Sequence, residues 1–374
     1  MPSTLLRQQL FKRVRSVVVK VGTALLTGPD GQLDRRRIAS IARQIATLHA
    51  RGIRVTLVSS GAVGSGIGLT GQPRRPRSVP LLQATAAIGQ PALMTLYART
   101  LNRFGLHAGQ ILVTRKDFEE RTRYVNISNT IAALHRLKAI PIINENDTIA
   151  VDELDRFADN DTISALVTNL LRADLLILLT VVDGLLDASG QLIDLVTRVD
   201  GQVRAFARSD KSALGSGGMV TKLGAAKMVT DAGEPVIIAS GRRPNVLLKL
   251  FEGQRIGTLF APSDRKLSAR QRWIGAAVRP AGQIVVDAGA AQAIRSGGKS
   301  LLASGIRLVS GTFPRGTIVR IVTADGVPIA HGVSNYSSAE LDKIKGLRSS
   351  QFAEVLGSRP YDEAVHRDNL VLIE

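Results

Sequence analysis

Two lysines that stand beside glycines at the ends of expected elements are the residues best suited to chemistry. Residues 215–222 (GSGGMVTK) join a glycine-rich segment to a helix-like run, and residues 17–23 (VVVKVGT) place Lys20 where an apolar strand ends. Glycine lets backbone N–H groups close around phosphate oxygens, and a following helix adds the positive end of its dipole. Two lysines in such positions suit a nucleotide whose phosphate is being transferred, so the pattern indicates a kinase.

Neither of the two glycine-rich segments matches a standard nucleotide-binding motif. The Walker P-loop places its lysine before the hydroxyl residue, whereas this chain has the order Thr221-Lys222. Residues 61–68 (GAVGSGIG) follow an apolar strand but depart from G-x-G-x-x-G, because Leu69 stands in place of the last glycine. An ordinary glycine turn is the alternative interpretation of either segment.

Polar residues follow the apolar strand expected at 140–144. Residues 144–148 (NENDT) include Asp147, whose carboxylate suits an ammonium group of a substrate. The alternative is a polar turn, for which Asn and Asp are the usual residues. Residues 59–61 (SSG) end another strand, and backbone amides there suit a carboxylate or acyl-phosphate oxygen. A nucleophilic serine is the competing interpretation, but no histidine lies in a recognisable triad motif.

Residues 159–162 (DNDT) precede the helix expected at 162–171. Asp and Thr at a helix start commonly cap the helix. Two acids that flank one asparagine exceed what capping requires. A second carboxylate at this place could hold two lysine ammonium groups between a nucleotide and its acceptor.

Strand-like and helix-like segments alternate up to about residue 262. Buried β-branched runs separated by helices predict an α/β fold with a mostly parallel sheet covered on both faces. Strands are expected at 16–21, 55–59, 110–114, 140–144, 175–180 and 235–239, and helices at 35–50, 81–104, 126–137 and 162–171. Sites in such sheets lie outside the carboxyl ends of the strands. Because the motifs with Lys20, Ser60, Asp147 and Thr180 all fall there, we expect one site.

The sequence changes character around residues 261–272. Short β-type segments follow at 283–286, 306–310 and 318–323, and Asp325-Gly326 is a hairpin signal. The expected organisation is a first domain at 1–262, a linker at 263–275, and a small β-rich domain with the C-terminal tail at 276–374.

Composition predicts a soluble globular protein of a reducing compartment. Of the 374 residues, 44% are hydrophobic and none is cysteine, which excludes disulfides and thiolate zinc sites. The five histidines are scattered, so no metal site is expected. The N-terminal segment lacks the apolar region of a secretory signal, and residues 175–182, the most apolar run, are too short to span a bilayer. We therefore expect a cytoplasmic protein that does not enter membranes.

The net charge of +18 raises the possibility of a nucleic-acid partner. Residues 1–262 carry 34 Lys+Arg against 21 Asp+Glu, and residues 263–374 carry 15 against 10. The excess is spread evenly along the chain, so no basic domain stands out. Attraction of anionic substrates explains the charge as well as RNA binding does.

The motifs taken together resemble the amino acid kinase family. The matching segments are VVVKVGT (17–23), SSGAV (59–63), INENDT (143–148), ADNDTISAL (158–166) and GSGGMVTK (215–222). The segment IAHGVSNYSS (329–338) is similar to the PUA domain, an RNA-binding type of module. Within the family, the chain is most similar to members that phosphorylate glutamate and carry this appended domain.

The resemblance implies an αβα sandwich with a mostly parallel central sheet, followed by the PUA domain. It also implies ATP-dependent phosphorylation of the L-glutamate γ-carboxylate to L-glutamyl 5-phosphate, the first step of proline biosynthesis, with Mg²⁺ held mainly through ATP phosphates. Lys20 and Lys222 would contact the phosphates, and Asp161 would organise the lysines. Glutamate would be bound by Ser60, Asp147 and Asn160. The nucleotide would be bound by Lys20, Thr180, Val181, Ser216, Gly217, Gly218, Met219, Val220, Thr221 and Lys222.

One departure from the family pattern concerns the nucleotide contacts. Relatives often have Thr-Asp where this chain has Thr180-Val181. A contact made by that acidic side chain is therefore absent, whereas a backbone contact can survive.

The resemblance further implies feedback inhibition by proline, a homo-oligomer (dimer or tetramer), and a glutamyl phosphate reductase as the next enzyme. RNA binding through the PUA domain stays open. Two alternatives remain: a kinase of the same fold for another small anionic acceptor, and a protein that acts by binding RNA through its C-terminal domain. Few aromatic residues in that domain argue against the second.

Overall fold

The computed structural model describes residues 3–28, 32–72, 74–149, 160–209, 218–264, 266–277, 280–358 and 360–373. The chain divides into two compact units. The first contains Met1–Asp117 and Arg121–Lys266, and the second contains Phe118–Glu120 and Leu267–Glu374. The stretch 263–275, expected as a linker, contains a short helix, α12 (Ala269–Arg272), and most of a π-helical turn, η1 (Trp273–Ala277).

An eight-stranded sheet forms the centre of the first unit, in the order β3-β4-β2-β1-β5-β7-β8-β6. All neighbours pair in parallel except β7 and β8, which are antiparallel. The strands are β1 (Ser16–Val21), β2 (Arg54–Val58), β3 (His107–Val113), β4 (Ala139–Glu145), β5 (Leu175–Thr180), β6 (Leu195–Val196), β7 (Val236–Ser240) and β8 (Thr258–Phe260). The parallel order brings the carboxyl ends of β4, β2, β1 and β5 to one edge.

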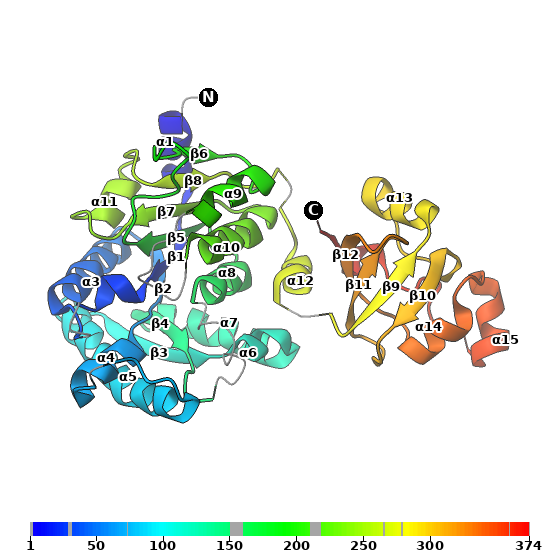
Figure 1. Ribbon diagram of the computed structural model, residues 1–374, viewed down its shortest axis with the longest axis horizontal. Coiled ribbons are helices and arrows are strands. Elements are labelled where there is room, and N and C mark those ends of the chain that lie inside the picture. Colours follow the sequence, from blue (N-terminus) through cyan, green and yellow to red (C-terminus); the bar gives the residue numbers. More distant parts are fainter. Residues whose placement is uncertain are drawn as a thin grey trace. The chain divides into compact units, whose positions relative to one another are not determined.

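Helices cover both faces of this sheet (Figure 1). Helices α3, α5 and α11 pack on one face, and α7, α8 and α10 on the other. The helices of this part of the chain are α1 (Ser3–Arg13), α2 (Thr23–Leu26), α3 (Arg35–Ala50), α4 (Ala62–Thr70), α5 (Val79–Asn102), α6 (Arg115–Glu119), α7 (Arg121–Arg136), α8 (Asn160–Leu171), α9 (Gly201–Ser209), α10 (Met219–Asp231) and α11 (Val246–Phe251). The prediction of an α/β sandwich with a mostly parallel sheet is confirmed.

All six strands and four helices predicted for this unit are present, and several further elements were not predicted, among them β6, β8 and α1. Strands β6 and β8 were missed because they have only two and three residues. Helix α1 was also missed. It carries the fully buried Arg7, whose guanidinium donates to the carbonyl oxygens of Ile256 and Gly257 at 3.1 and 2.9 Å. A basic residue near a chain end is usually exposed, so only the tertiary structure reveals this anchor.

The glycine-rich residues 61–68 form a turn and a helix. Gly61 has φ 103°, which favours glycine, and α4 begins at the next residue. The glycines within α4 permit close packing against α5. A Cβ on Gly66 would lie 1.9 Å from the carbonyl oxygen of Thr85, and one on Gly89 would lie 1.9 Å from that of Ala62. The absence of these side chains fixes the spacing of the two helices.

Gly89→Ala is expected to lower the free energy of unfolding by about 3 kcal/mol, because the new methyl group must push apart two backbones. Urea unfolding followed by circular dichroism measures this change. Gly224→Ala is the matched control, since Gly224 is an exposed helical glycine in α10 whose added Cβ meets no atom within 4 Å. That control should gain about 0.5–1 kcal/mol. Equal effects of the two substitutions would contradict the packing argument.

The second unit is built on a five-stranded sheet in the order β10-β9-β11-β12-β13 (Figure 1). Its hydrophobic core includes Ile284, Ile321 and Tyr336. The predicted hairpin is present, because β11 and β12 pair antiparallel and Gly326 between them has φ 82°. Its elements after α12 and η1 are β9 (Gly282–Val286), α13 (Ala288–Gly297), η2 (Ala303–Gly305), β10 (Ile306–Ser310), β11 (Ile318–Val322), β12 (Pro328–Val333), α14 (Ser338–Ile344), η3 (Ser349–Gln351), α15 (Phe352–Leu356), η4 (Arg367–Asn369) and β13 (Leu370–Leu372).

Candidate active site

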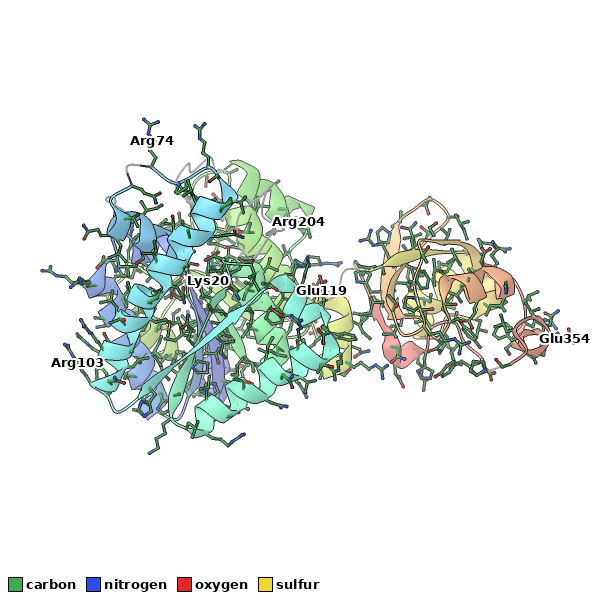
Figure 2. The ribbon with its side chains drawn as sticks, turned by 90° about the horizontal axis from the view of Figure 1, so that it is seen from below. Lys20, Arg74, Arg103, Glu119, Arg204 and Glu354 are labelled. Atoms are coloured by element: carbon green, nitrogen blue, oxygen red, sulfur yellow. The ribbon has the colours of Figure 1, made fainter. Side chains whose placement is uncertain are left out.

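Lys20 is a buried lysine near the carboxyl end of β1. Side chains alternate between the two faces of a strand, and Val17, Val19 and Val21 belong to the hydrophobic core that includes α3 and α5. Lys20 therefore points to the opposite face, where α8 packs against β1. Its side chain is only 7% exposed, and Figure 2 shows it inside the first unit, whereas Arg74 and Arg103 project from the surface. A lysine so deeply buried requires a partner.

That partner is Asp161, in the first turn of α8. Its Oδ1 lies 2.6 Å from Lys20 Nζ, and its Oδ2 lies 3.2 Å from Lys222 Nζ. The Thr221 hydroxyl donates to the same Oδ2 at 2.8 Å. Asp161 is 1% exposed and Lys222 5%. One carboxylate thus holds two ammonium groups that are 202 positions apart in the sequence.

The electrostatic balance of this cluster keeps Asp161 ionised. Burial by itself would raise the pKa of the Asp161 carboxyl, but Lys20, Lys222 and the Thr221 hydroxyl outweigh it and hold that pKa below the ordinary 3.8. The cluster consequently carries two positive charges against one negative charge. Its excess positive charge in a buried place suits an anion.

The amino end of α10 adds to this positive potential. Gly218 is the N-cap residue, has an extended backbone (ψ −177°), and provides no side-chain cap. Met219, Val220 and Thr221 form the first turn, where backbone N–H groups lack intrahelical partners and favour phosphate. Ser216 and Gly217, which the sequence also proposed for nucleotide binding, lie outside the described residues.

A second polar group lies at the ends of β2 and β4. Asn160 Nδ2 donates to Ser60 Oγ at 2.9 Å and to Asn144 Oδ1 at 3.3 Å. Asn144 Nδ2 in turn donates to Gln90 Oε1 at 2.8 Å. All four residues are at most 9% exposed. Because Asn160 and Asp161 are adjacent, this group and the lysine cluster adjoin each other.

The remaining predicted residues lie at the same edge of the sheet. Thr180 ends β5 and is half-buried, and its carbonyl oxygen accepts from Gly241 N at 2.8 Å. Val181 packs against the hydrophobic core. Asp147 lies in the turn after β4 and is half-buried. The structure thus joins Lys20, Asp161, Thr221 and Lys222 in one contact network and Ser60 with Asn160 in another.

One predicted helix boundary changes with the structure, and one residue of the site was missed. Asn160 and Asp161 are part of α8, although the helix was expected to begin at residue 162. Gln90 lies in the middle of α5, far from every motif in the sequence. The available signal was its polar side chain within a mostly apolar helix, directly after Gly89.

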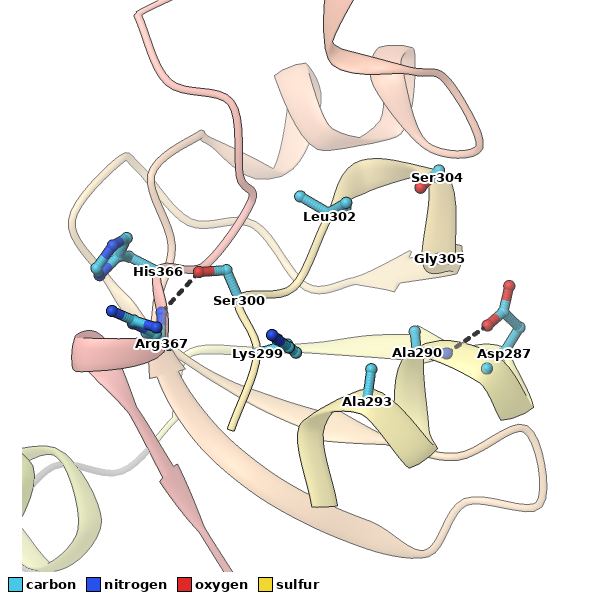
Figure 3. A pocket seen from close by; sticks show the side chains of 11 residues that line it. Asp287, Ala290, Ala293, Lys299, Ser300, Leu302, Ser304, Gly305, His366 and Arg367 are labelled. Carbon is cyan, nitrogen blue, oxygen red and sulfur yellow. Dashed lines mark hydrogen bonds between the residues drawn. The ribbon is translucent and has the colours of Figure 1, made fainter. Parts of the chain in front are cut away.

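The second unit contains a cavity of about 630 Å³. Figure 3 shows Lys299, Ser300, His366 and Arg367 at one end and Asp287 at the other. The Arg367 backbone N–H donates to Ser300 Oγ at 3.0 Å. No residue proposed from the sequence for the active site lines this cavity. RNA binding through the second unit stays a prediction.

Among the residues that the structure describes, no helix is long and apolar enough to cross a bilayer. Within the same ranges, no group of three or more His, Cys, Asp or Glu side chains is arranged to hold a metal ion.

Two family models and several curated relatives match this chain. The model of the amino acid kinase family matches residues 15–240, and that of the PUA domain matches residues 282–356. Curated relatives named glutamate 5-kinase include those of Citrifermentans bemidjiense and Geobacter sulfurreducens. They are 44% and 43% identical, and each alignment covers 98% of this chain and 100% of the relative. The relative from Moorella thermoacetica is 44% identical, over 97% of both chains.

Among solved structures, a carbamate kinase from Giardia is similar to this chain. The TM-score is 0.48 and the sequence identity 21%, with 67% of this chain and 100% of that one covered.

Proposed function

The chain belongs to the amino acid kinase family, and from this premise we propose that it transfers the γ-phosphate of ATP to the γ-carboxylate of L-glutamate. A carboxylate oxygen attacks the γ-phosphorus, the bond from that phosphorus to the bridging oxygen of ADP breaks, and L-glutamyl 5-phosphate and ADP are formed. This is the first step of proline biosynthesis. The name and full-length similarity of the curated relatives support this acceptor.

The observation that carries the proposal is the contact of both Lys20 and Lys222 with Asp161. An ionised carboxylate is already a nucleophile at neutral pH, so the reaction needs no strong general base. Its difficulty is to bring two anions together and to stabilise charge on the phosphoryl oxygens during transfer. Two ammonium groups in fixed positions, in a site shielded from water, meet both requirements.

The nucleotide phosphates are bound by the amino end of α10 together with Lys20 and Lys222. The ends of β1 and β5, which pair Val21 with Leu179, support the nucleotide through Thr180 and Val181. Both oxygens of Asp161 face ammonium groups, so this carboxylate does not fit a role as a Mg²⁺ ligand. When MgATP binds, the cation would be held through the ATP phosphates rather than by this carboxylate, and it would partly neutralise their charge.

Glutamate is bound at the neighbouring group of Ser60 and Asn160. The Oδ1 atom of Asn160 is buried and has no hydrogen-bond partner among the described residues. It is an acceptor, because the Nδ2 of the same amide donates to Ser60 and Asn144. The α-ammonium group of an amino acid is a donor suited to this atom, and Asp147 supplies a carboxylate at the same edge.

We also propose the wider setting that the sequence suggested. Proline, the product of the pathway, inhibits the first enzyme. The protein is cytoplasmic, forms a dimer or tetramer, and supplies its labile acyl phosphate to a glutamyl phosphate reductase. The name glutamate 5-kinase of the curated relatives supports the reaction on which this setting depends.

The proposal predicts glutamate-dependent turnover of MgATP. With hydroxylamine as a trap, the enzyme should form the γ-hydroxamate of glutamate, and added proline should suppress it. The control omits glutamate and should give no hydroxamate. Turnover with another carboxylate or phosphate acceptor, but none with glutamate, would retain the family and refute the substrate.

A further inference from the structure

Helix α5 carries two buried polar side chains on the face that meets the carboxyl ends of the strands. Gln90 and Tyr97 are seven residues apart, which is about two helical turns, so they share one face. Gln90 Oε1 accepts from Asn144 on β4 at 2.8 Å. The Tyr97 hydroxyl lies 3.2 Å from Ser59 Oγ, directly after β2. Gln90 is 9% exposed and Tyr97 is fully buried. Helix α5 thus contacts residues at the ends of both β2 and β4, where the proposed glutamate-binding residues lie.

The orientation of the Gln90 contact is fixed from the backbone. The Glu145 backbone N–H donates to Asn144 Oδ1 at 2.9 Å, so that atom must be the oxygen of the amide. Asn144 Nδ2 is therefore the atom that faces Gln90, and it requires an acceptor there. The same Asn144 oxygen accepts from Asn160 Nδ2, which directs Asn160 Oδ1 away from this chain of hydrogen bonds. Gln90 is thus one end of a chain of hydrogen bonds that runs through Asn144 to Asn160, whose Oδ1 is the atom proposed to bind the substrate.

The Tyr97 contact reaches the residue directly before Ser60. Ser59 Oγ lies 3.2 Å from the carbonyl oxygen of Ser60 and 3.2 Å from the Tyr97 hydroxyl, and either hydroxyl can donate in the contact between Ser59 and Tyr97. Burial raises the pKa of Tyr97 to about 12, which keeps the hydroxyl protonated at neutral pH. Through Ser59, Tyr97 holds the backbone on which Ser60 is mounted.

The axial position of α5 is also set. A Cβ on Gly89 would lie 2.4 Å from the backbone nitrogen of Gly66 in α4, which begins two residues after Ser60. Close contact with α4 prevents α5 from sliding along its axis. Gln90, the next residue, therefore contacts Asn144 from a fixed position along the axis of α5.

We propose that Gln90 and Tyr97 are positioning residues that set the geometry of the acceptor site without touching the reacting atoms. Gln90 acts through Asn144 on Asn160, and Tyr97 acts through Ser59 on Ser60. The proposal rests on the proposed function, because it assigns glutamate to the group of Ser60 and Asn160. In this proposal, α5 is the element that determines the affinity of the site for glutamate.

Gln90→Met tests the proposed action of Gln90 on Asn160 through Asn144. Methionine has a similar length but no strong acceptor, so Asn144 loses its partner and the Asn160 amide is free to turn. The KM for glutamate should rise about tenfold, while the KM for ATP stays within about twofold and kcat within about threefold. Gln90→Glu is the matched control, because it keeps an oxygen for Asn144 Nδ2 and should restore most of the affinity for glutamate.

Tyr97→Phe tests the proposed action of Tyr97 on Ser60 through Ser59, with little change in packing. We expect the KM for glutamate to rise about threefold with the KM for ATP unchanged. The melting temperature of each variant is measured alongside. A normal KM for glutamate in both folded variants, or an equal rise in the two KM values, overturns the proposal.

The wild-type protein separates this proposal from the proposed function. No glutamyl hydroxamate from the wild type refutes the function itself. Normal wild-type activity together with unaffected variants refutes only the role of α5. If Gln90→Met does not fold, Tyr97→Phe and Gln90→Glu still decide: the expected pattern is a raised KM for glutamate in the first and a nearly normal value in the second.

Discussion

Replacement of Asp161 by asparagine is expected to lower kcat for glutamate-dependent ATP turnover by about 10³-fold. The amide has nearly the same shape but no charge. Lys20 and Lys222 would then be buried near each other without the carboxylate that now lies 2.6 and 3.2 Å from them. Their mutual repulsion would move both ammonium groups away from the phosphoryl oxygens, and catalysis depends on that placement.

Steady-state kinetics of Asp161→Asn, with the melting temperature as a test of folding, measures this effect. Asp174→Asn is the matched control. Asp174 accepts from the backbone of Ser16 at 2.9 Å, at the opposite end of β1 from the lysine cluster. Its loss should lower stability but change kcat by less than about twofold. A folded Asp161→Asn protein with kcat near that of the wild type would show that the cluster is only structural.

The lowered pKa of Asp161 fixes the sign of its pH dependence. A group whose pKa is lower in the folded state stabilises the fold fully at pH values above its unfolded pKa, here 3.8. That stabilisation is lost only as the pH falls through the folded pKa. At neutral pH the carboxylate is therefore fully ionised, and the loss of kcat in the asparagine variant reports the loss of its charge.

Lys222→Ala is expected to lower kcat by about 10²- to 10³-fold and to raise the KM for glutamate by less than about threefold. The ammonium group is proposed to act on the phosphoryl oxygens during transfer, so its main contribution is to the transition state. Thr221 and Lys20 still hold Asp161 in this variant, which limits the disturbance.

Lys227→Ala is the control for this substitution. Lys227 is on the same helix, five residues later, and forms a surface ion pair with Asp231 at 2.7 Å. Such exposed pairs contribute little to stability, and kcat should be unchanged. Near-normal turnover of Lys222→Ala would remove Lys222 from the mechanism, and a rise in KM without a fall in kcat would assign it to ground-state binding.

The sequence predicted most of the first unit because long, regular patterns specify its main elements. Strand β5 (LLILLT) is apolar at five consecutive positions, as is typical of a parallel strand covered on both faces, and α3 shows a clear amphipathic period. Short elements lack such a pattern. The glycines of α4 illustrate the limit, because they were interpreted as a turn or a phosphate-binding loop. In the structure they permit contact with α5, a neighbour that local sequence does not specify.

The sequence by itself determined which residue types stand at the strand ends: Lys20, Ser60, Asn144 and Thr180 each follow or end an apolar run. Parallel strands bring their carboxyl ends to one edge, so a shared site could be deduced. Only the tertiary structure decided which side chains meet. The pairing of Lys20 and Lys222 with Asp161, and the contact of Gln90 with Asn144, depend on helix placement and strand register across long separations in sequence. Those distances arise from packing of the whole unit, and no local segment encodes them.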